Sequence, residues 1–337
     1  MSTDGYFPKE PPVEVTILAA KDGVRTTLRV WNPRGEKPSG VKLPLLFVVG
    51  ASTTHEVFST PTIDVNTVEY FNERGYTVYV LLPRFGAVPS SELGYTPFEA
   101  RLDVLAAAEF VRSRSEGLKI QVFLAQWVGA VNARAARIPS LTNLYTKLTG
   151  NPFYDINSSP SSPLIQQVID QILRFYPVGS SAELCNSVAC HRLDFVFSRL
   201  WVHANLTHST HSHVGNFFGG IYMRLLSLLM AGARAAIEAQ ASPENKDPKI
   251  VLNDRGENMV TGEGVERLQG LPIQLISGGE NVVYTPEATN LAYDMLRNRF
   301  GTELYRRTVV PKYGHLDCWI GRTAHEDVYP HVAEHVR

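Results

Sequence analysis

The sequence has few cysteines, no excess of charge of either sign and no long purely apolar run. Three cysteines in 337 residues cannot form a disulfide framework, so reduced thiols are the default and a Cys185–Cys190 bridge is an open alternative. The 32 basic and 33 acidic residues leave a net charge of −1, which argues against binding to nucleic acid or to an anionic membrane surface. A chain of this length needs no such staples to bury a core.

A membrane span and a secretory signal are also missing from the pattern. The most apolar stretch begins at Ile221, but Arg224 and Arg234 interrupt it, so we interpret it as a buried amphipathic helix. The N-terminal residues include no apolar segment of the kind that a signal peptide needs. We therefore expect a cytoplasmic protein without a membrane span. Nothing in the composition indicates the oligomeric state.

Apolar runs alternate with helical periodicity in two parts of the chain. Strands buried on both faces are continuous apolar runs, whereas helices repeat apolar residues every three or four positions. The alternation predicts an α/β fold with a doubly wound, mostly parallel sheet. A hairpin is expected at 13–30, with further strands at 43–50, 77–83, 119–126, 272–279 and 304–311, and helices at 66–73, 97–115, 131–136 and from Pro286.

Residues 151–247 break this alternation and are rich in helical patterns, aromatic residues and histidines. We interpret them as a helical cap inserted between the two parts of one core, residues 1–150 and 248–337. Some of the aromatic side chains should line a cleft between cap and sheet, which favours a small apolar molecule as the ligand. No phosphate-binding glycine motif follows a strand, so no cofactor is expected.

Several motifs, in order, resemble the α/β-hydrolase superfamily. More narrowly, the chain resembles the hydrolase-like domain associated with GMC-type (cholesterol-oxidase-like) oxidoreductases, a group distantly akin to the acid lipases. The most specific motif is YGHLDC at 313–318, followed by DVYP at 327–330. The resemblance covers the chain from about Val13 to its end. Further matching segments are 62–84, ILRFYPV at 172–178, CHRLDF at 190–195 and GGENVVYTPEAT at 278–289.

The resemblance implies a catalytic site at the strand ends. His315 stands where the superfamily keeps its general base, and Glu280 or Asn281 stands where it keeps the acid that orients this histidine. We expect His315 and Glu280 to be catalytic, with Asn281 as the alternative that would stabilise an imidazolium less well.

The superfamily also places a Ser or Cys nucleophile at the tip of a strand–turn–helix elbow. Here the pentapeptide AQWVG occupies residues 125–129, so the tip is Trp127. An indole has only a weakly acidic N–H and cannot attack a carbonyl. The oxyanion hole would survive, because its donors are backbone N–H groups, here those of Val128 and of Ala51 or a neighbour. We expect Gln126 and Trp127 to line the substrate site as well, unless Trp127 fills the hole.

Four histidines lie between His203 and His213, a density that invites a metal interpretation. Because no carboxylate or cysteine lies beside them at ligand spacing, we expect no metal and interpret them as cap residues. His211 is expected to reach the substrate site. Cys318 is expected to pack in the core.

These features predict an enzyme that has lost covalent hydrolysis and uses His315 as a general acid or base on an apolar carbonyl-bearing metabolite. Cyclisation, aldol or Knoevenagel-type condensation, dehydration, isomerisation and pericyclic steering all suit such a site, in a setting of natural-product biosynthesis. Two alternatives stay open. One is a pseudo-hydrolase that only binds a ligand or partner, and the other is a hydrolase in which His315 activates water directly.

Overall fold

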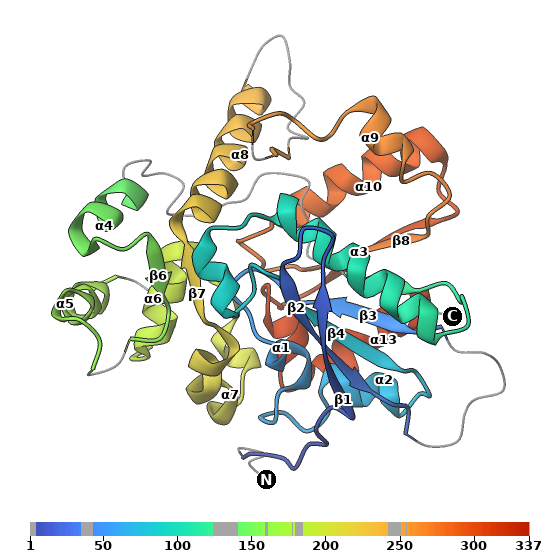
Figure 1. Cartoon of the computed structure of the whole chain (residues 1–337), viewed down its shortest axis with the longest axis horizontal. Coiled ribbons are helices and arrows are strands. Elements are labelled where there is room, and N and C mark those ends of the chain that lie inside the picture. The colour runs from blue at the N-terminus through green and yellow to red at the C-terminus, as the bar shows by residue number, and fades with distance from the viewer. Residues whose placement is uncertain are drawn as a thin grey trace.

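The computed structural model describes residues 5–34, 43–123, 141–158, 161–176, 178, 185–241, 251–253 and 255–336. Within these residues a five-stranded sheet has the order β1-β2-β4-β3-β5, and two more pairs of strands, β6-β7 and β8-β9, lie outside it (Figure 1). The strands are β1 Glu14–Ala19, β2 Arg25–Trp31, β3 Leu45–Val48, β4 Val78–Leu82, β5 Gln121–Phe123, β6 Phe153–Asp155, β7 Gly220–Tyr222, β8 Ile273–Gly278 and β9 Tyr305–Val310.

The expected α/β fold is confirmed, but the five-stranded sheet is mixed and not mostly parallel. β2 pairs antiparallel with both β1 and β4, whereas β3 pairs parallel with both β4 and β5. The short turn between β1 and β2 can only make an antiparallel hairpin, while the connection from β4 to β5 passes through a helix and allows a parallel crossover. β8 and β9 are parallel as well.

The described helices accompany these strands or lie between residues 141 and 241. Those beside the sheets are α1 Glu56–Ser59, α2 Thr67–Asn72, α3 Pro97–Arg114, α9 Gly262–Glu266, α10 Pro286–Phe300, α11 Asp317–Ile320, α12 Ala324–Asp327 and α13 Tyr329–His335. Those in between are α4 Leu141–Thr149, α5 Leu164–Leu173, α6 Val188–Phe197, α7 His208–His213 and α8 Met223–Ala241. Short 3-10 turns are η1 Pro89–Leu93, η3 His203–Asn205 and η4 Val214–Phe217.

Apolar side chains bury both faces of the central strands β3 and β4. On one face, Leu46, Val48 and Leu81 pack with Ala107 and Val111 of α3. The alternate residues of the same strands point to the other face, because successive side chains of a strand alternate. They join a larger cluster that includes Leu45, Phe47, Val78, Val80, Phe58, Phe71, Ile320 and Tyr329. This two-sided burial is why β3 and β4 are continuous apolar runs.

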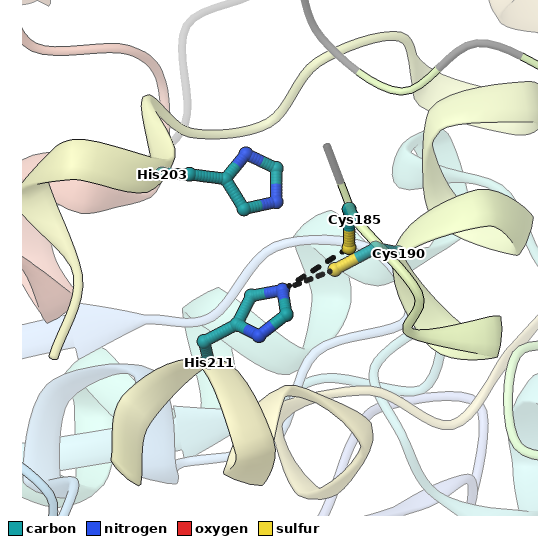
Figure 2. A group of neighbouring side chains, drawn as sticks. All are labelled: Cys185, Cys190, His203 and His211. Carbon is teal, nitrogen blue, oxygen red and sulfur yellow. Dashed lines mark hydrogen bonds between the residues drawn. The ribbon is translucent and has the colours of Figure 1, made fainter. Parts of the chain in front are cut away.

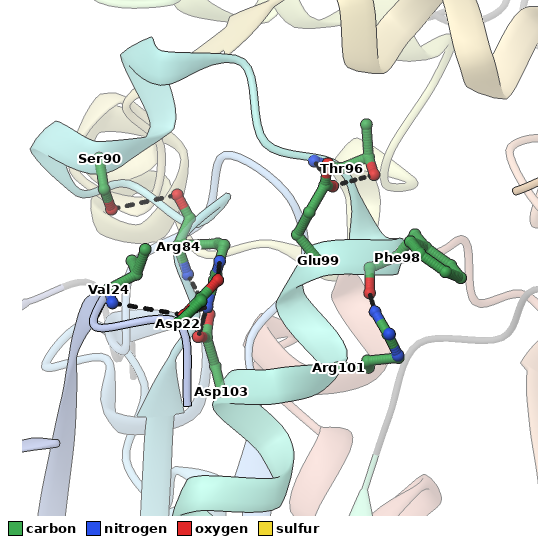
Figure 3. Close-up of polar contacts among 9 residues, drawn as sticks. All are labelled: Asp22, Val24, Arg84, Ser90, Thr96, Phe98, Glu99, Arg101 and Asp103. Carbon is green, nitrogen blue, oxygen red and sulfur yellow. Dashed lines mark hydrogen bonds and ion pairs between the residues drawn. The ribbon is translucent and has the colours of Figure 1, made fainter. Parts of the chain in front are cut away.

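A buried ion network fixes the end of β4 (Figure 3). The Arg84 guanidinium is fully buried and contacts the equally buried carboxylate of Asp103 in α3, with Nη2 2.7 Å from Oδ1. The Arg84 backbone N–H donates to the same carboxylate at 2.8 Å. Its Nη2 also donates to Asp22 in the β1–β2 turn at 3.0 Å. Three elements are therefore joined at one cation, whose pKa is raised further by these carboxylates.

Residues 151–241, called the cap segment here, carry α5 to α8 and the small β6-β7 sheet, and much of the segment lies to one side of the main sheet in Figure 1. The expected amphipathic helix near Ile221 is α8, preceded by β7, which contains Ile221 itself. Among the helices of the described residues, none is both long enough and apolar enough to cross a membrane.

Candidate active site

His315 and Asn281 lie on neighbouring segments at the carboxyl ends of β9 and β8. These strands are parallel neighbours, so the segments that follow them leave at the same edge, where α/β proteins usually bind ligands. The two segments touch at Gly278, where an added Cβ would lie 2.0 Å from the Gly314 carbonyl oxygen. The Glu280 N–H also donates to the Tyr313 carbonyl at 2.8 Å. Only glycine at position 278 permits this approach.

The side chain that contacts His315 is that of Asn281. Its Nδ2 lies 3.2 Å from Nδ1 of His315. Glu280, our first choice for the orienting acid, is more than half exposed and contacts Arg199, with 3.3 Å between Oε2 and Nη2. Of the two candidates that the sequence leaves open, the structure therefore places the amide and not the carboxylate against the imidazole.

The hydrogen bonds of Asn281 determine the tautomer of His315. Its Oδ1 accepts hydrogen bonds from the backbone N–H groups of Val283 and Tyr284, both at 3.0 Å. In the flipped amide the NH₂ group would point at these two N–H donors, so the flipped orientation is excluded. The Nδ2 group must then donate to Nδ1 of His315. Because Nδ1 accepts a hydrogen bond, the neutral imidazole carries its proton on Nε2. A hydrolytic triad needs the opposite tautomer, with Nε2 free to accept a proton.

The surroundings keep His315 neutral. Burial lowers the pKa of its imidazole to about 4, and the ring of Tyr284, itself so buried that its pKa rises to about 12, lies 5.4 Å away between centroids. Near pH 7 the side chain is therefore an uncharged hydrogen-bond donor at Nε2. The expected role of His315 as a general acid or base stays a prediction.

The cap segment also holds the His315 loop in place, in addition to the contacts with the segment after β8. The Leu200 carbonyl accepts the N–H groups of both His315, at 3.0 Å, and Leu316, at 2.8 Å. Buried Asp317 accepts the Gly314 N–H at 2.9 Å and the Asn205 amide at 2.7 Å. Burial nevertheless raises the pKa of the Asp317 carboxyl. The position of His315 thus depends on contacts with residues far away in the sequence.

The loop after β3 carries the remaining described candidate, Ala51. Within the described part of the chain its backbone N–H has no acceptor, whereas the N–H of Ser52 donates to the Phe85 carbonyl at 2.9 Å. Ser52 is fully buried and has a φ of 64°, a left-handed conformation that is costly for serine and typical of functional loops. The sequence contains no signal for this strain. Gln126, Trp127 and Val128 lie outside the described residues.

Because Gln126, Trp127 and Val128 lie outside the described residues, the expected contact of His211 with the substrate site stays a prediction. His211 lies on α7, and its Nε2 faces the sulfur atoms of Cys185 and Cys190 (Figure 2). Both cysteines are free thiols, without a bridge between them. Cys318 is buried, as expected. Sequence spacing does not reveal the Cys–His cluster, because its members come from separate elements.

A surface pocket of about 340 Å³ lies at the opposite, amino ends of β8 and β9. Its walls are mostly polar and lie away from His315, so we do not assign the site to it. The residues that line it are Pro272, Glu303, Leu304, Arg306, Glu334 and His335.

His55 and His315 are neutral in the folded protein, and we therefore expect the free energy of unfolding to fall in mild acid. Burial lowers the pKa of His55 to about 4, as it does that of His315, and Arg29 adds to the shift at His55. In the unfolded chain both titrate near ~6.5, so the unfolded state binds protons first and stability falls as the pH drops from about 6.5 to about 4. The expected loss is about 3 kcal/mol for each histidine.

Urea unfolding at pH 7, 5.5 and 4.5 measures this loss. His55→Gln should flatten the dependence, whereas His208→Gln, a change at an exposed histidine, should leave it unchanged. An unaltered dependence in His55→Gln would contradict the assignment.

No known sequence family matches the chain, and no curated protein sequence is similar enough to count as a relative. Solved structures are similar over nearly the whole chain. A carboxyl esterase from Bacillus coagulans is 12% identical, with a TM-score of 0.53, and the match covers 96% of this chain and 99% of the esterase. DcsB, solved with a substrate analogue, is 13% identical, with a TM-score of 0.52 over 96% and 98% of the two chains.

A hypothetical protein from Pseudomonas aeruginosa is 14% identical, with a TM-score of 0.50 over 100% of this chain and 97% of its own. At these identities the likeness concerns the fold. Together with the order of the strands, it shows that the chain has the α/β-hydrolase fold.

Proposed function

We propose that this chain is an α/β-hydrolase-fold enzyme that carries out a non-hydrolytic step on a small apolar carbonyl compound. The observation that carries the proposal is the contact between Asn281 and His315, which sets a tautomer unsuited to a triad. The sequence supports it independently, because Trp127 stands where the superfamily keeps its nucleophile. The narrower likeness to the GMC-associated hydrolase-like domain, the division into a core of 1–150 and 248–337 with a cap of 151–247, and a role in natural-product biosynthesis belong to the same proposal.

The chemistry available to His315 narrows the reaction types. A neutral imidazole with its proton on Nε2 can donate a hydrogen bond to a carbonyl oxygen and stabilise negative charge that develops there. It cannot accept a proton at Nε2 without first losing one. Cyclisation and pericyclic steps of carbonyl-conjugated substrates are accelerated by a polarised carbonyl and one held conformer, so they suit this donor better than condensations that need a base. The backbone N–H of Ala51 would supply a second donor to the same oxygen.

Activation of water by His315 is disfavoured for the same reason. A water nucleophile must give its proton to a base, and the Nε2 atom of His315 already carries a proton. The tautomer therefore favours the non-hydrolytic one of the two catalytic alternatives that the sequence leaves open. The tautomer does not by itself distinguish an enzyme from a ligand-binding protein. The carbonyl stretch of a bound probe makes that distinction.

Infrared difference spectra of a bound ¹³C=O-labelled cyclic enone test the proposal. We expect the carbonyl stretch to shift to lower frequency in the wild type, because two hydrogen bonds polarise it. His315→Leu should bind the enone with a smaller shift. His315→Gln, which restores an N–H donor, should recover part of the shift.

Hydrolysis is measured in parallel with p-nitrophenyl esters. Ester turnover that depends on His315 would contradict the proposal and support water activation. An enone that binds without any carbonyl shift would leave only the binding role.

A further inference from the structure

Four potential metal ligands converge within the cap segment (Figure 2). They are Cys185, Cys190, His203 and His211, and one ligand atom of each lies within 4.8 Å of the other three. The Nε2 atom of His211 is 3.3 Å from Sγ of Cys185 and 3.2 Å from Sγ of Cys190. The rings of His203 and His211 are 5.1 Å apart between centroids.

These distances approach those of a tetrahedral zinc centre. Zinc binds sulfur at about 2.3 Å and imidazole nitrogen at about 2.0 Å, which places tetrahedral ligand atoms roughly 3.3–3.8 Å apart. The two N···S distances at His211, 3.3 and 3.2 Å, lie at and just below the short end of that range. Closing the widest separation from 4.8 Å requires a movement of about one ångström, well within the reach of side-chain rotation.

We propose that Cys185, Cys190, His203 and His211 bind one structural zinc ion. Two thiolates and two imidazoles are a set that favours zinc over the oxygen-preferring cations magnesium and calcium. Four protein ligands complete the tetrahedron, so no position stays open for water or substrate, and the ion has a structural role.

The local fold already supports a charged sulfur pair. The Ser187 N–H donates to Sγ of Cys185 at 3.4 Å. The hydroxyl of Ser187 accepts the Cys190 N–H, also at 3.4 Å, and so caps α6 next to the second sulfur. His191, the residue after Cys190 in α6, contacts the Cys185 carbonyl at 2.9 Å and fixes the backbone there. Backbone N–H groups and a helix N-terminus both favour negative charge on sulfur.

Two neighbouring histidines, His208 and His213, are not part of the cluster. His213 is engaged elsewhere, with its Nε2 2.5 Å from the Glu56 carboxylate. His208 is exposed on α7 and is not part of the cluster. An ion at the four ligands would join the start of α6, the turn at 203–205 and α7, three elements that lie in different parts of the cap segment.

Metal analysis of the full chain, expressed without a polyhistidine tag in zinc-supplemented medium and purified under reducing conditions, tests this proposal. We expect about one zinc ion per chain in the wild type. Cys190→Ser and His211→Gln should each lower the zinc content about tenfold or more. His208→Gln on the same helix and Cys318→Ser outside the cluster should keep it.

A second measurement does not require the variants to fold. Co²⁺ added to the metal-depleted, reduced wild type should produce thiolate-to-cobalt charge-transfer absorption and the visible bands of a tetrahedral site. Zinc should abolish them and raise the melting temperature by several degrees, since it binds only the folded state. Reduced protein without bound zinc and without cobalt bands, or a Cys185–Cys190 disulfide in protein isolated without reductant that reforms despite excess zinc, would overturn the proposal.

Discussion

Asn281→Asp is expected to raise the pKa of His315 from about 4 toward its ordinary value of ~6.5 and to move the proton of the neutral ring from Nε2 to Nδ1. The carboxylate would keep the two backbone N–H donors on one oxygen and accept the Nδ1–H on the other. An adjacent negative charge favours an imidazolium by roughly 1–3 pKa units. This one change would convert the donor at Nε2 into a base.

Nitrogen-15 NMR of histidine-labelled protein measures both quantities, with His315 assigned by its loss in His315→Gln. Glu280→Gln is the matched control, because it alters the adjacent residue, whose carboxylate contacts Arg199. It should leave the pKa and the tautomer unchanged. If Glu280→Gln shifts the His315 titration and Asn281→Asp does not, then Glu280 is the orienting acid and the tautomer assignment is wrong.

Arg84→Met should lower the free energy of unfolding by about 3–5 kcal/mol, the usual cost of leaving one member of a buried ion pair without its partner. Asp22 is partly exposed and can turn to water, but Asp103 is fully buried and would keep its charge among apolar neighbours. The size of the effect therefore comes from Asp103. Urea unfolding provides the measurement.

The double variant Arg84→Met/Asp103→Leu removes the stranded carboxylate and should recover a large part of the loss. Glu263→Ala breaks the exposed pair with Arg267 and should cost about 0.5 kcal/mol or less. A double variant no more stable than Arg84→Met alone would mean that the loss comes from packing or from the hairpin contact with Asp22.

The strands could be predicted from the sequence because the burial of a strand determines the residue pattern within that strand. Residues buried on both faces must be apolar at every position, so the runs at 43–50 and 77–83 correspond to the fully buried strands β3 and β4. The runs at 272–279 and 304–311 correspond to β8 and β9, which are only partly buried and include polar residues. The mixed direction of the sheet follows from the hairpin predicted at 13–30. The sequence does not indicate which further strand pairs with β2. That partner, β4, is about fifty residues away along the chain.

The site could be predicted only to the nearest segment. Glu280 and Asn281 are adjacent, and nothing in their order says which side chain turns toward His315. The structure separates them because Asn281 Oδ1 is occupied by two backbone donors of the following turn. The Cys–His cluster was beyond sequence reasoning for another reason. Its pairs have four and seven intervening residues, and no short spacing marks them as ligands.

The single carbonyl of Leu200, which accepts two N–H groups of the His315 loop, links the integrity of the site to the cap segment. Local unfolding in proteins involves cooperative units much smaller than the whole domain. If residues 200–205 detach, the amides of His315 and Leu316 become exchangeable while β3 and β4 stay protected. The site would then have its own opening equilibrium, set by the cap segment and independent of the stability of the sheet.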